Sequence, residues 1–136
     1  MKEEWYLGLD CSTQGLKAEV IDGKLSLVAS ASINFDRDLP HYKTRAGAHV
    51  KDLRATAPSI MFAEALDLLL SNMSSKGDSK KRVDLSKIVG IGISGQQHGS
   101  VFWKIGAEAK LKSLDPGLGL RDQLNGCFAL KEGPIW

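Results

Sequence analysis

Three strand-like runs open the chain, and they constrain its fold more than any other feature. An apolar run covers residues 5–10, and residues 16–21 and 25–35 follow with apolar and polar positions in alternation. Alternation of this kind is typical of a β-strand with one buried face. The stretch at residues 22–24 reads Asp-Gly-Lys, a signal for a hairpin turn. We therefore predict a β-meander of three consecutive strands.

An amphipathic helix is expected next, over residues 57–73. Pro58 stands near its start, where a proline fits. Apolar residues recur there at helical spacing: Ile60, Met61, Ala65, Leu68 and Leu69. A further strand is expected at residues 88–94, and a strand–helix–strand crossover favours parallel pairing with the helix over one sheet face. The predicted fold class is therefore α/β, with a mixed sheet formed by a β-meander and then a βαβ unit.

The remaining segments give weaker signals. Residues 36–51 show no clear periodicity, and we expect irregular extended chain there. Residues 74–82 are polar and basic, which fits a solvated connector better than a nuclear targeting signal. Towards the C-terminus we expect a strand at residues 100–104, a turn at 115–117, a short helix at 118–125 and entry into another strand at 133–136.

Length and composition argue against several classes of protein. The chain has 136 residues, the size of one domain, and a net charge of +2, which gives no argument for binding nucleic acid or a membrane. No apolar run approaches the roughly 18 residues of a membrane span, and the N-terminal apolar segment is too short for a secretion signal. Cys11 and Cys127 form no metal-site or disulfide framework, so we expect free thiols and a cytoplasmic protein.

A carboxylate stands where the first predicted strand ends. Asp10 could cap the following turn, hold a hydrated cation or act as a base, and turn capping is the common role. The turn that follows supplies hydroxyls and free amides that suit an anion, from Ser12, Thr13, Gln14 and Gly15. Mg²⁺ is often held by one or two carboxylates together with retained waters and substrate phosphates. The stretch therefore indicates phosphoryl chemistry.

Residues 90–95 match the spacing of a dinucleotide-binding fingerprint, G-x-G-x-x-G. That fingerprint requires its glycines in a turn that opens a helix. Here Gly90 and Gly92 alternate with isoleucines inside the predicted strand, and Gln-Gln-His follows. We therefore reject a dinucleotide site and expect both glycines to allow close packing of the meander or of the helix on the sheet.

A second set of polar residues leaves this strand at Gln96, Gln97 and His98. Two amides and an imidazole offer several donors and acceptors with little fixed charge, which suits a neutral polyol or sugar. A structural role is the common alternative for a lone histidine, but three successive polar residues between glycines are hard to explain as core. Trp103 and Trp136 could stack on a sugar face, although core packing is the commoner role of an aromatic residue in or near a strand.

Taken together, these motifs resemble the FGGY family of carbohydrate kinases, and within it the longer, animal-and-plant-like xylulose kinases. The matching stretches follow one another along essentially the whole chain: GLDCSTQ at 8–14, FDRDLP at 35–40, ALD at 65–67, GQQHGS at 95–100 and PIW at 134–136. Each stretch is weak alone, and together they are specific. The commoner family turn is Asp-x-Gly-Thr, and Ser12 takes the glycine place here.

The resemblance implies part of an actin-like/hexokinase/Hsp70 (RNase H-like) ATPase lobe. It also implies ATP-dependent phosphorylation of D-xylulose to D-xylulose 5-phosphate, with Mg²⁺ as cofactor. Asp10 would then lie beside the metal, bound through water, and Thr13 and Gln14 would line the phosphate path. Gln97 and His98 would bind the sugar hydroxyls.

The resemblance further implies that residues 1–136 form an incomplete N-terminal lobe, with the second lobe absent, because family members are several times longer. The catalytic base, an aspartate, would lie beyond residue 136, so no residue here is assigned that role. We expect no kinase activity from this chain alone. We also expect either poor solubility or a partner chain over the sheet edge that it leaves uncovered. The alternative is a non-catalytic sugar-binding or interaction module derived from a sugar kinase.

Overall fold

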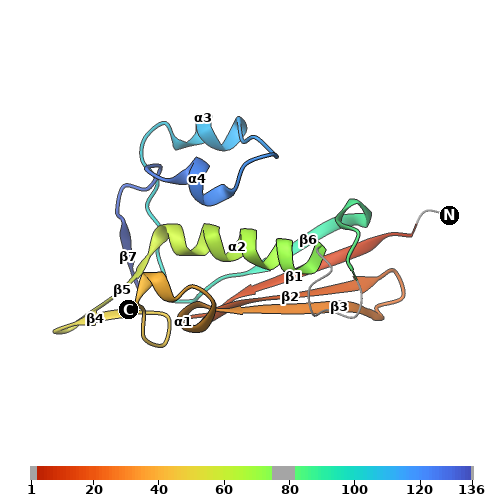
Figure 1. Ribbon diagram of the computed structural model, residues 1–136, viewed down its shortest axis with the longest axis horizontal. Coiled ribbons are helices and arrows are strands. Elements are labelled where there is room, and N and C mark those ends of the chain that lie inside the picture. The colour runs from red at the N-terminus through yellow and green to blue at the C-terminus, as the bar shows by residue number, and fades with distance from the viewer. Residues whose placement is uncertain (1–2, 75–81, 136) are drawn as a thin grey trace.

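A mixed four-stranded sheet forms the base of the molecule (Figure 1). The computed structural model describes residues 3–74 and 82–135. β1 (Trp5–Cys11) pairs antiparallel with β2 (Gly15–Asp22), and β2 pairs antiparallel with β3 (Leu27–Asn34). β6 (Ile88–Ser94) lies parallel to β1, which gives the order β3-β2-β1-β6. The predicted meander and the predicted parallel crossover are both confirmed.

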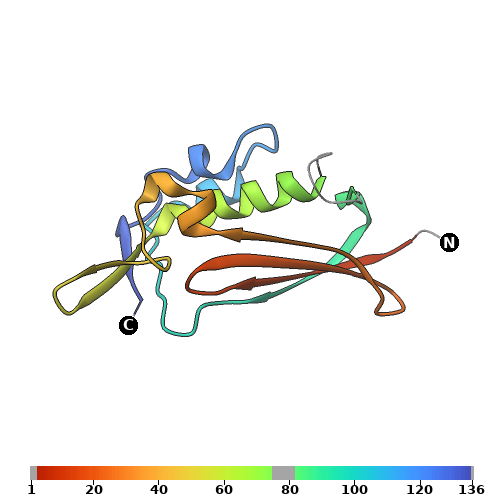
Figure 2. The ribbon, with the colours of Figure 1, turned by 60° about the horizontal axis from the view of Figure 1, so that its bottom comes forward.

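The helix α2 (Ser59–Ser74) covers one face of this sheet, over β2 and β3 (Figure 2). It buries Met61, Ala65, Leu69 and Met73, which recur every four residues and so share one side of the helix. They form a single core with the inward-facing strand residues Leu7, Leu9, Leu16, Ala18, Val20 and Ile33. The predicted helix is confirmed, with its start two residues later than expected.

A second sheet of three short strands lies beside the start of α2 (Figure 1). β5 (Arg54–Pro58) runs directly into the helix and pairs antiparallel with β4 (His49–Lys51) and β7 (Glu132–Pro134). Strand entry near the C-terminus is confirmed as β7, whereas β4 and β5 were not predicted. Strands this short show too few alternating positions, and the proline that ends β5 indicated a helix start instead.

Two short helical turns replace the irregular chain expected after the third strand. α1 (Phe35–Asp38) begins where β3 ends, and the Asn34 side chain caps it by accepting a hydrogen bond from the Arg37 amide. η1 (Pro40–Tyr42) follows, with Pro40 at its first position. Phe35 was expected to end the strand, but it is the first residue of α1 and is fully buried.

The segment after β6 corrects one prediction and confirms two. No strand forms at residues 100–104, where Trp103 makes only an isolated bridge to Phe128. The expected turn at 115–117 is present, and the expected short helix is α4 (Leu120–Leu124). Two further short elements were not predicted, η2 (Leu85–Lys87) and α3 (Ala107–Lys112).

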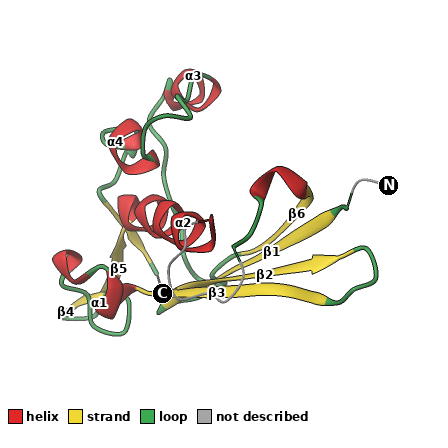
Figure 3. Ribbon diagram, turned by 45° about the vertical axis from the view of Figure 1, so that its right-hand side comes forward, coloured by secondary structure: helices red, strands yellow, loops and turns green. Residues whose placement is uncertain are grey.

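The helices α2, α3 and α4 all lie on one side of the four-stranded sheet (Figure 3). α4 is fixed to α2 because the Asp67 carboxylate accepts a hydrogen bond from the Leu120 amide at the start of α4. Within the described ranges, no helix is long and apolar enough to cross a membrane. Most of the predicted polar connector at 74–82, and Trp136 with its possible sugar contact, lie outside the described residues.

Candidate functional site

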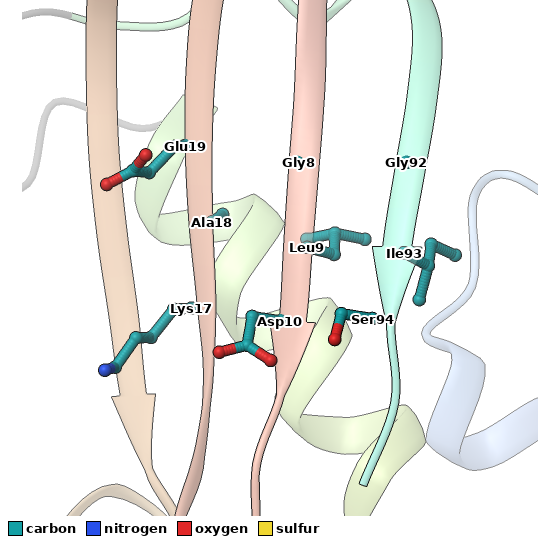
Figure 4. Close-up of a pocket in the computed structure, with 9 residues that line it drawn as sticks. All are labelled: Gly8, Leu9, Asp10, Lys17, Ala18, Glu19, Gly92, Ile93 and Ser94. Carbon is teal, nitrogen blue, oxygen red and sulfur yellow. The ribbon is translucent and has the colours of Figure 1, made fainter. Parts of the chain in front are cut away.

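The polar residues that follow β1 and those that follow β6 leave the sheet at the same edge, where both strands have their carboxyl ends. β1 and β6 are parallel neighbours, and Asp10 at the end of β1 stands in register with Ser94 at the end of β6. Asp10 is exposed on the face away from α2, because it alternates with the buried Leu9. Lys17 lies directly opposite Asp10 on β2, and Figure 4 shows both side chains with Ser94 at this edge.

Glycines make an open trough on this exposed face, beside Asp10. Gly8 on β1 and Gly92 on β6 are register partners, so the floor of the trough is backbone (Figure 4). The depression measures about 470 Å³ and also borders Glu19. A Cβ at Gly92 would meet nothing within 4 Å, so the predicted close packing is wrong at this position. At Gly90 a Cβ would lie 3.1 Å from the ring of Tyr6, its register partner on β1, so the close contact there is made within the sheet.

The turn after Asp10 is a tight hairpin between β1 and β2. The Ser12 amide donates to the Gly15 carbonyl oxygen at 2.9 Å, and the Ser12 hydroxyl donates to the same oxygen at 3.2 Å. Ser12 does not have a positive φ, so a serine fits in the place where the family more often has glycine. Among residues 3–74 and 82–135, no intramolecular hydrogen bond engages the amides of Thr13 and Gln14. These two donors are therefore available to an anion.

Asp10 suits a metal held through water. Within the described part of the chain, its carboxylate makes no ion pair. The same ranges contain no cluster of three or more His, Cys, Asp or Glu that could hold a metal ion. A single exposed carboxylate beside two free amides fits Mg²⁺ that keeps its waters and is shared with substrate phosphates.

Cys11, next to Asp10, is not set up as a nucleophile. Burial raises the pKa of its thiol, and the charge of Asp10 adds to this rise. A thiol with a raised pKa stays protonated near neutral pH and is a poor nucleophile and metal ligand. The groups that this edge offers to a ligand are therefore the carboxylate and the backbone donors.

The exit from β6 forms a second turn. The Gly99 amide donates to the Gln96 carbonyl oxygen at 3.4 Å, and Gln97 and His98 occupy the exposed tip between them. Both side chains are thus free to reach a ligand at the carboxyl edge of the sheet. A cavity lies beside this turn, and neither Gln97 nor His98 is among the residues that line it.

Gln96 borders that cavity instead, and the sequence did not single it out from Gln97. The cavity measures about 250 Å³, and its wall includes Cys11, Phe62 and Ile135. The Gln96 Nε2 atom is buried, and it has no hydrogen-bond partner among the residues that the structure describes. An amide of this kind favours a polar guest in the cavity, because a buried unpaired donor is costly. The only sequence signal was the doubled glutamine, which does not tell which of the two faces inward.

His41 and His49, to which the sequence assigned no role, make structural contacts. His41 Nε2 lies 3.0 Å from the Glu64 carboxylate on α2. His49 bridges the small sheet: its Nδ1 lies 2.5 Å from Glu132 and its Nε2 lies 2.7 Å from the Tyr42 carbonyl oxygen. These contacts tie the segment after α1 to α2 and to β7.

A family model for the N-terminal domain of the FGGY family of carbohydrate kinases matches residues 5–112. The chain therefore belongs to the FGGY family of carbohydrate kinases, as its motifs indicated. Its polar edge and its trough lie within the matched residues.

Xylulose kinases are among the relatives of this chain. It is 46% identical to xylulose kinase of Mus musculus over 132 residues and 40% identical to xylulose kinase 2 of Arabidopsis thaliana over 134 residues. Each alignment covers 96% of this chain and 23% of the relative. The chain thus spans less than a quarter of the length of these relatives.

Solved structures agree with the predicted fold class. The crystal structure of "a xyloylose kinase from Brucella ovis" matches with a TM-score of 0.57 and 25% identity, over 75% of this chain and 19% of that one. Glycerol kinase of Plasmodium falciparum with ADP matches with a TM-score of 0.51 and 20% identity, over 77% of this chain and 19% of that one. The second likeness concerns the fold alone.

Proposed function

We propose that this chain supplies the N-terminal part of a xylulose kinase, which transfers a phosphoryl group from ATP to D-xylulose and forms D-xylulose 5-phosphate. The observation that carries this proposal is the 46% identity to mouse xylulose kinase over 96% of the chain. The geometry supports it, because two sets of polar residues leave neighbouring parallel strands at one edge of the sheet. That edge offers an anion site beside a set of neutral polar groups.

The hairpin turn would hold the phosphate side. Thr13 and Gln14 would donate their free amides to phosphate oxygens, and Asp10 would accept hydrogen bonds from water bound to Mg²⁺. Mg²⁺, when bound, neutralises charge on the phosphoryl oxygens. The role of these residues is to fix the phosphates and to supply charge in a preformed arrangement.

The second turn would hold the sugar side. Gln97 offers an amide donor and acceptor, and His98 offers one donor and one acceptor when neutral, so together they match vicinal hydroxyl groups. Their exposed position at the tip suits contact with a ligand that a second lobe closes over. Discrimination between related sugars would come from such hydrogen bonds, because a site built to pair a hydroxyl rejects an analogue that lacks it.

The base that takes the proton of the attacking hydroxyl is assigned to no residue of this chain. We propose that the base and the adenosine-binding lobe lie outside residues 1–136, which would form an incomplete N-terminal lobe. The isolated chain is therefore expected to show no D-xylulose-dependent release of ADP from ATP. Turnover by the purified 136-residue chain would refute this assignment.

A chimera tests the proposed function directly. The segment of mouse xylulose kinase that aligns with this chain is replaced by residues 1–136, and D-xylulose-dependent ADP release is measured. We expect activity within about tenfold of the mouse enzyme, because the chimera would keep the full set of catalytic contacts. A tenfold change in rate corresponds to about 1.4 kcal/mol of activation free energy. A chimera that folds cooperatively but releases no ADP would contradict the proposal.

The non-catalytic alternative makes a different prediction for the chain alone. A sugar-binding module should bind D-xylulose as 136 residues, whereas half of a two-lobed site should bind it weakly. Calorimetric titration of the isolated chain with D-xylulose separates the two. Saturable binding below about 1 mM, equivalent to about −4 kcal/mol, would favour the binding module.

A further inference from the structure

The loop formed by residues 43–48 packs against the Thr13–Gln14 turn. Gly47 has a φ of +79°, and a Cβ built on it would lie 1.8 Å from the Thr13 carbonyl oxygen. The loop backbone therefore touches the turn directly, with no room for a side chain between them. Any shift of Gly47 must also move the turn, because packed backbones do not deform freely.

The loop has an unusual backbone that needs external support. Lys43 and Ala46 have φ values of 56° and 53°, in the left-handed region that non-glycine residues seldom adopt. The Arg45 and Ala48 backbones exchange hydrogen bonds at 2.9 and 3.1 Å, which closes the loop into a tight turn. A conformation of this kind persists only where neighbouring groups hold it.

The Asp36 carboxylate supplies that support. It accepts three hydrogen bonds from the loop: from the Thr44 hydroxyl at 2.7 Å, from the Ala46 amide at 2.6 Å and from the Gly47 amide at 3.0 Å. Thr44 is buried, and two of the three donors are backbone amides in the strained segment. Hydrogen bonds to a charged acceptor are the stronger kind.

The residue before Asp36 holds the same turn from another side. The Phe35 amide donates to the Gln14 carbonyl oxygen at 3.0 Å, and the Phe35 ring is fully buried. Phe35 and Asp36 therefore clamp the turn between the start of α1 and the loop. Among the residues that the structure describes, the Gln14 carbonyl oxygen is thus engaged by Phe35, while the amides of Thr13 and Gln14 make no hydrogen bond.

We propose that Asp36 is a positioning residue for the phosphate turn: it fixes loop 43–48 against Thr13 and so holds the amides of Thr13 and Gln14 ready for an anion. Asp36 itself touches no ligand in this role. The proposal rests on the proposed function only in taking the ligand of the turn to be a phosphate. The mechanical link from Asp36 to the turn does not depend on it.

The test compares Asp36→Asn with Asp38→Asn in the 136-residue chain. Asp38 is a matched control, because it is an aspartate on the same helical turn whose carboxylate pairs with Arg37 and accepts from the Asn34 amide. Hydrogen exchange of the Ser12 amide, measured by NMR, reports the hairpin turn. We expect at least tenfold faster exchange of this amide in Asp36→Asn and less than twofold change in Asp38→Asn.

An unchanged Ser12 exchange rate, together with faster exchange at Ala46 and Gly47, would overturn the proposal and leave Asp36 as a local loop cap. Thr44→Val provides a milder second variant in case Asp36→Asn unfolds the chain. It removes one of the three donors at nearly constant volume, and we expect a smaller acceleration at Ser12 in the same direction. No acceleration in this variant would also count against the proposal.

A titration with MgADP separates this proposal from the proposed function. If the turn binds phosphate in this chain, MgADP should shift the amide resonances of Thr13 and Gln14 in the unsubstituted chain and shift them less in Asp36→Asn. No shift in the unsubstituted chain would count against the phosphate role. The Ser12 exchange rates would still decide whether Asp36 positions the turn.

Discussion

The neighbouring strands β1 and β6 have similar apolar sequences but opposite surroundings. Leu7 and Leu9 of β1 are 4% and 8% exposed, whereas their register partners on β6, Ile91 and Ile93, are 62% and 75% exposed. Register partners in a parallel pair point to the same face. The difference therefore comes from the cover above each strand and not from the strand sequences.

The layer formed by α2 extends over β1 but not over β6. α2 packs over β2 and β3, and its apolar side reaches Leu7 and Leu9 in the core. Among the described residues nothing comparable lies over β6, which is also an edge strand. Burial of an apolar strand is thus set by the tertiary arrangement. The partner chain expected over this edge stays a prediction, and the exposed isoleucines mark where it would sit.

The largest expected effect comes from an alanine pair that breaks this contrast. Leu7→Ala should lower the free energy of unfolding by about 2–5 kcal/mol, because it leaves a cavity under α2. The matched change Ile91→Ala should alter it by no more than about 0.5 kcal/mol, as is usual for surface positions. Urea denaturation of the 136-residue chain measures both. Equal losses would show that β6 is covered in solution, and that the contrast is wrong.

Two glycines sharpen the comparison at the level of backbone. A Cβ at Gly15 on β2 would lie 2.3 Å from the Ile33 carbonyl oxygen, whereas one at Gly92 on β6 would meet nothing within 4 Å. Gly15→Ala should therefore cost about 1–3 kcal/mol through overpacking. Gly92→Ala should be neutral within about 0.5 kcal/mol, as at an ordinary surface site. A large loss at Gly92, measured by thermal unfolding, would contradict the open trough.

The smallest effect concerns the small sheet, which is held by polar contacts where the main sheet has an apolar core. Burial lowers the pKa of His49, but hydrogen bonds to the Tyr42 oxygen and to Glu132 outweigh it and leave the pKa raised. Burial raises the pKa of Glu132, but hydrogen bonds from Thr56 and His49 outweigh it and leave this pKa lowered.

The directions of these two pKa shifts set the pH range in which the contact between His49 and Glu132 is stabilising. The His49 contribution is complete below its unfolded pKa of about 6.5 and is lost as pH rises through the raised folded pKa. The Glu132 contribution is complete above about 4.3 and is lost as pH falls through the lowered folded pKa. Raising the pH from 6 to 8.5 should cost about 0.2–1 kcal/mol in the unsubstituted chain, since the pair is partly exposed. If His49→Gln showed the same loss, the assignment to His49 would be wrong.

The sequence predicted those parts of the fold in which local pattern and tertiary burial agree. The alternating apolar positions of β1 and β2 are buried, and in α2 Met61, Ala65 and Leu69 are buried while Ile60 and Leu68 are half-buried, so periodicity found these elements. The strand predicted at residues 100–104 is wrong, because the apolar residues there stay exposed and pair with no strand. β4 and β5 were not predicted, because three to five residues carry too little periodic information.

The candidate site was predictable where a residue type signals its chemistry. Asp10 and the Gln97–His98 pair stood out as polar groups at strand ends, and the parallel register of β1 and β6 brings those ends to one edge. Gln96 stood out only as one of three polar residues, and Asp36 received no role, because their importance lies in which way a side chain faces and in contacts across ten residues of loop. Such contacts depend on the folded backbone and leave no periodic signal.

The most direct test of the central claim measures kcat and KM in the chimera with mouse xylulose kinase. Asp10→Asn should lower kcat about 10–100-fold, as expected for a group that orients metal-bound water, while His98→Gln should mainly raise the KM for D-xylulose. Glu19→Gln, on the same open face but away from the edge, is the matched control and should change neither. If Asp10→Asn left kcat unchanged in a folded chimera, the turn after β1 would not be the phosphate side of a kinase site.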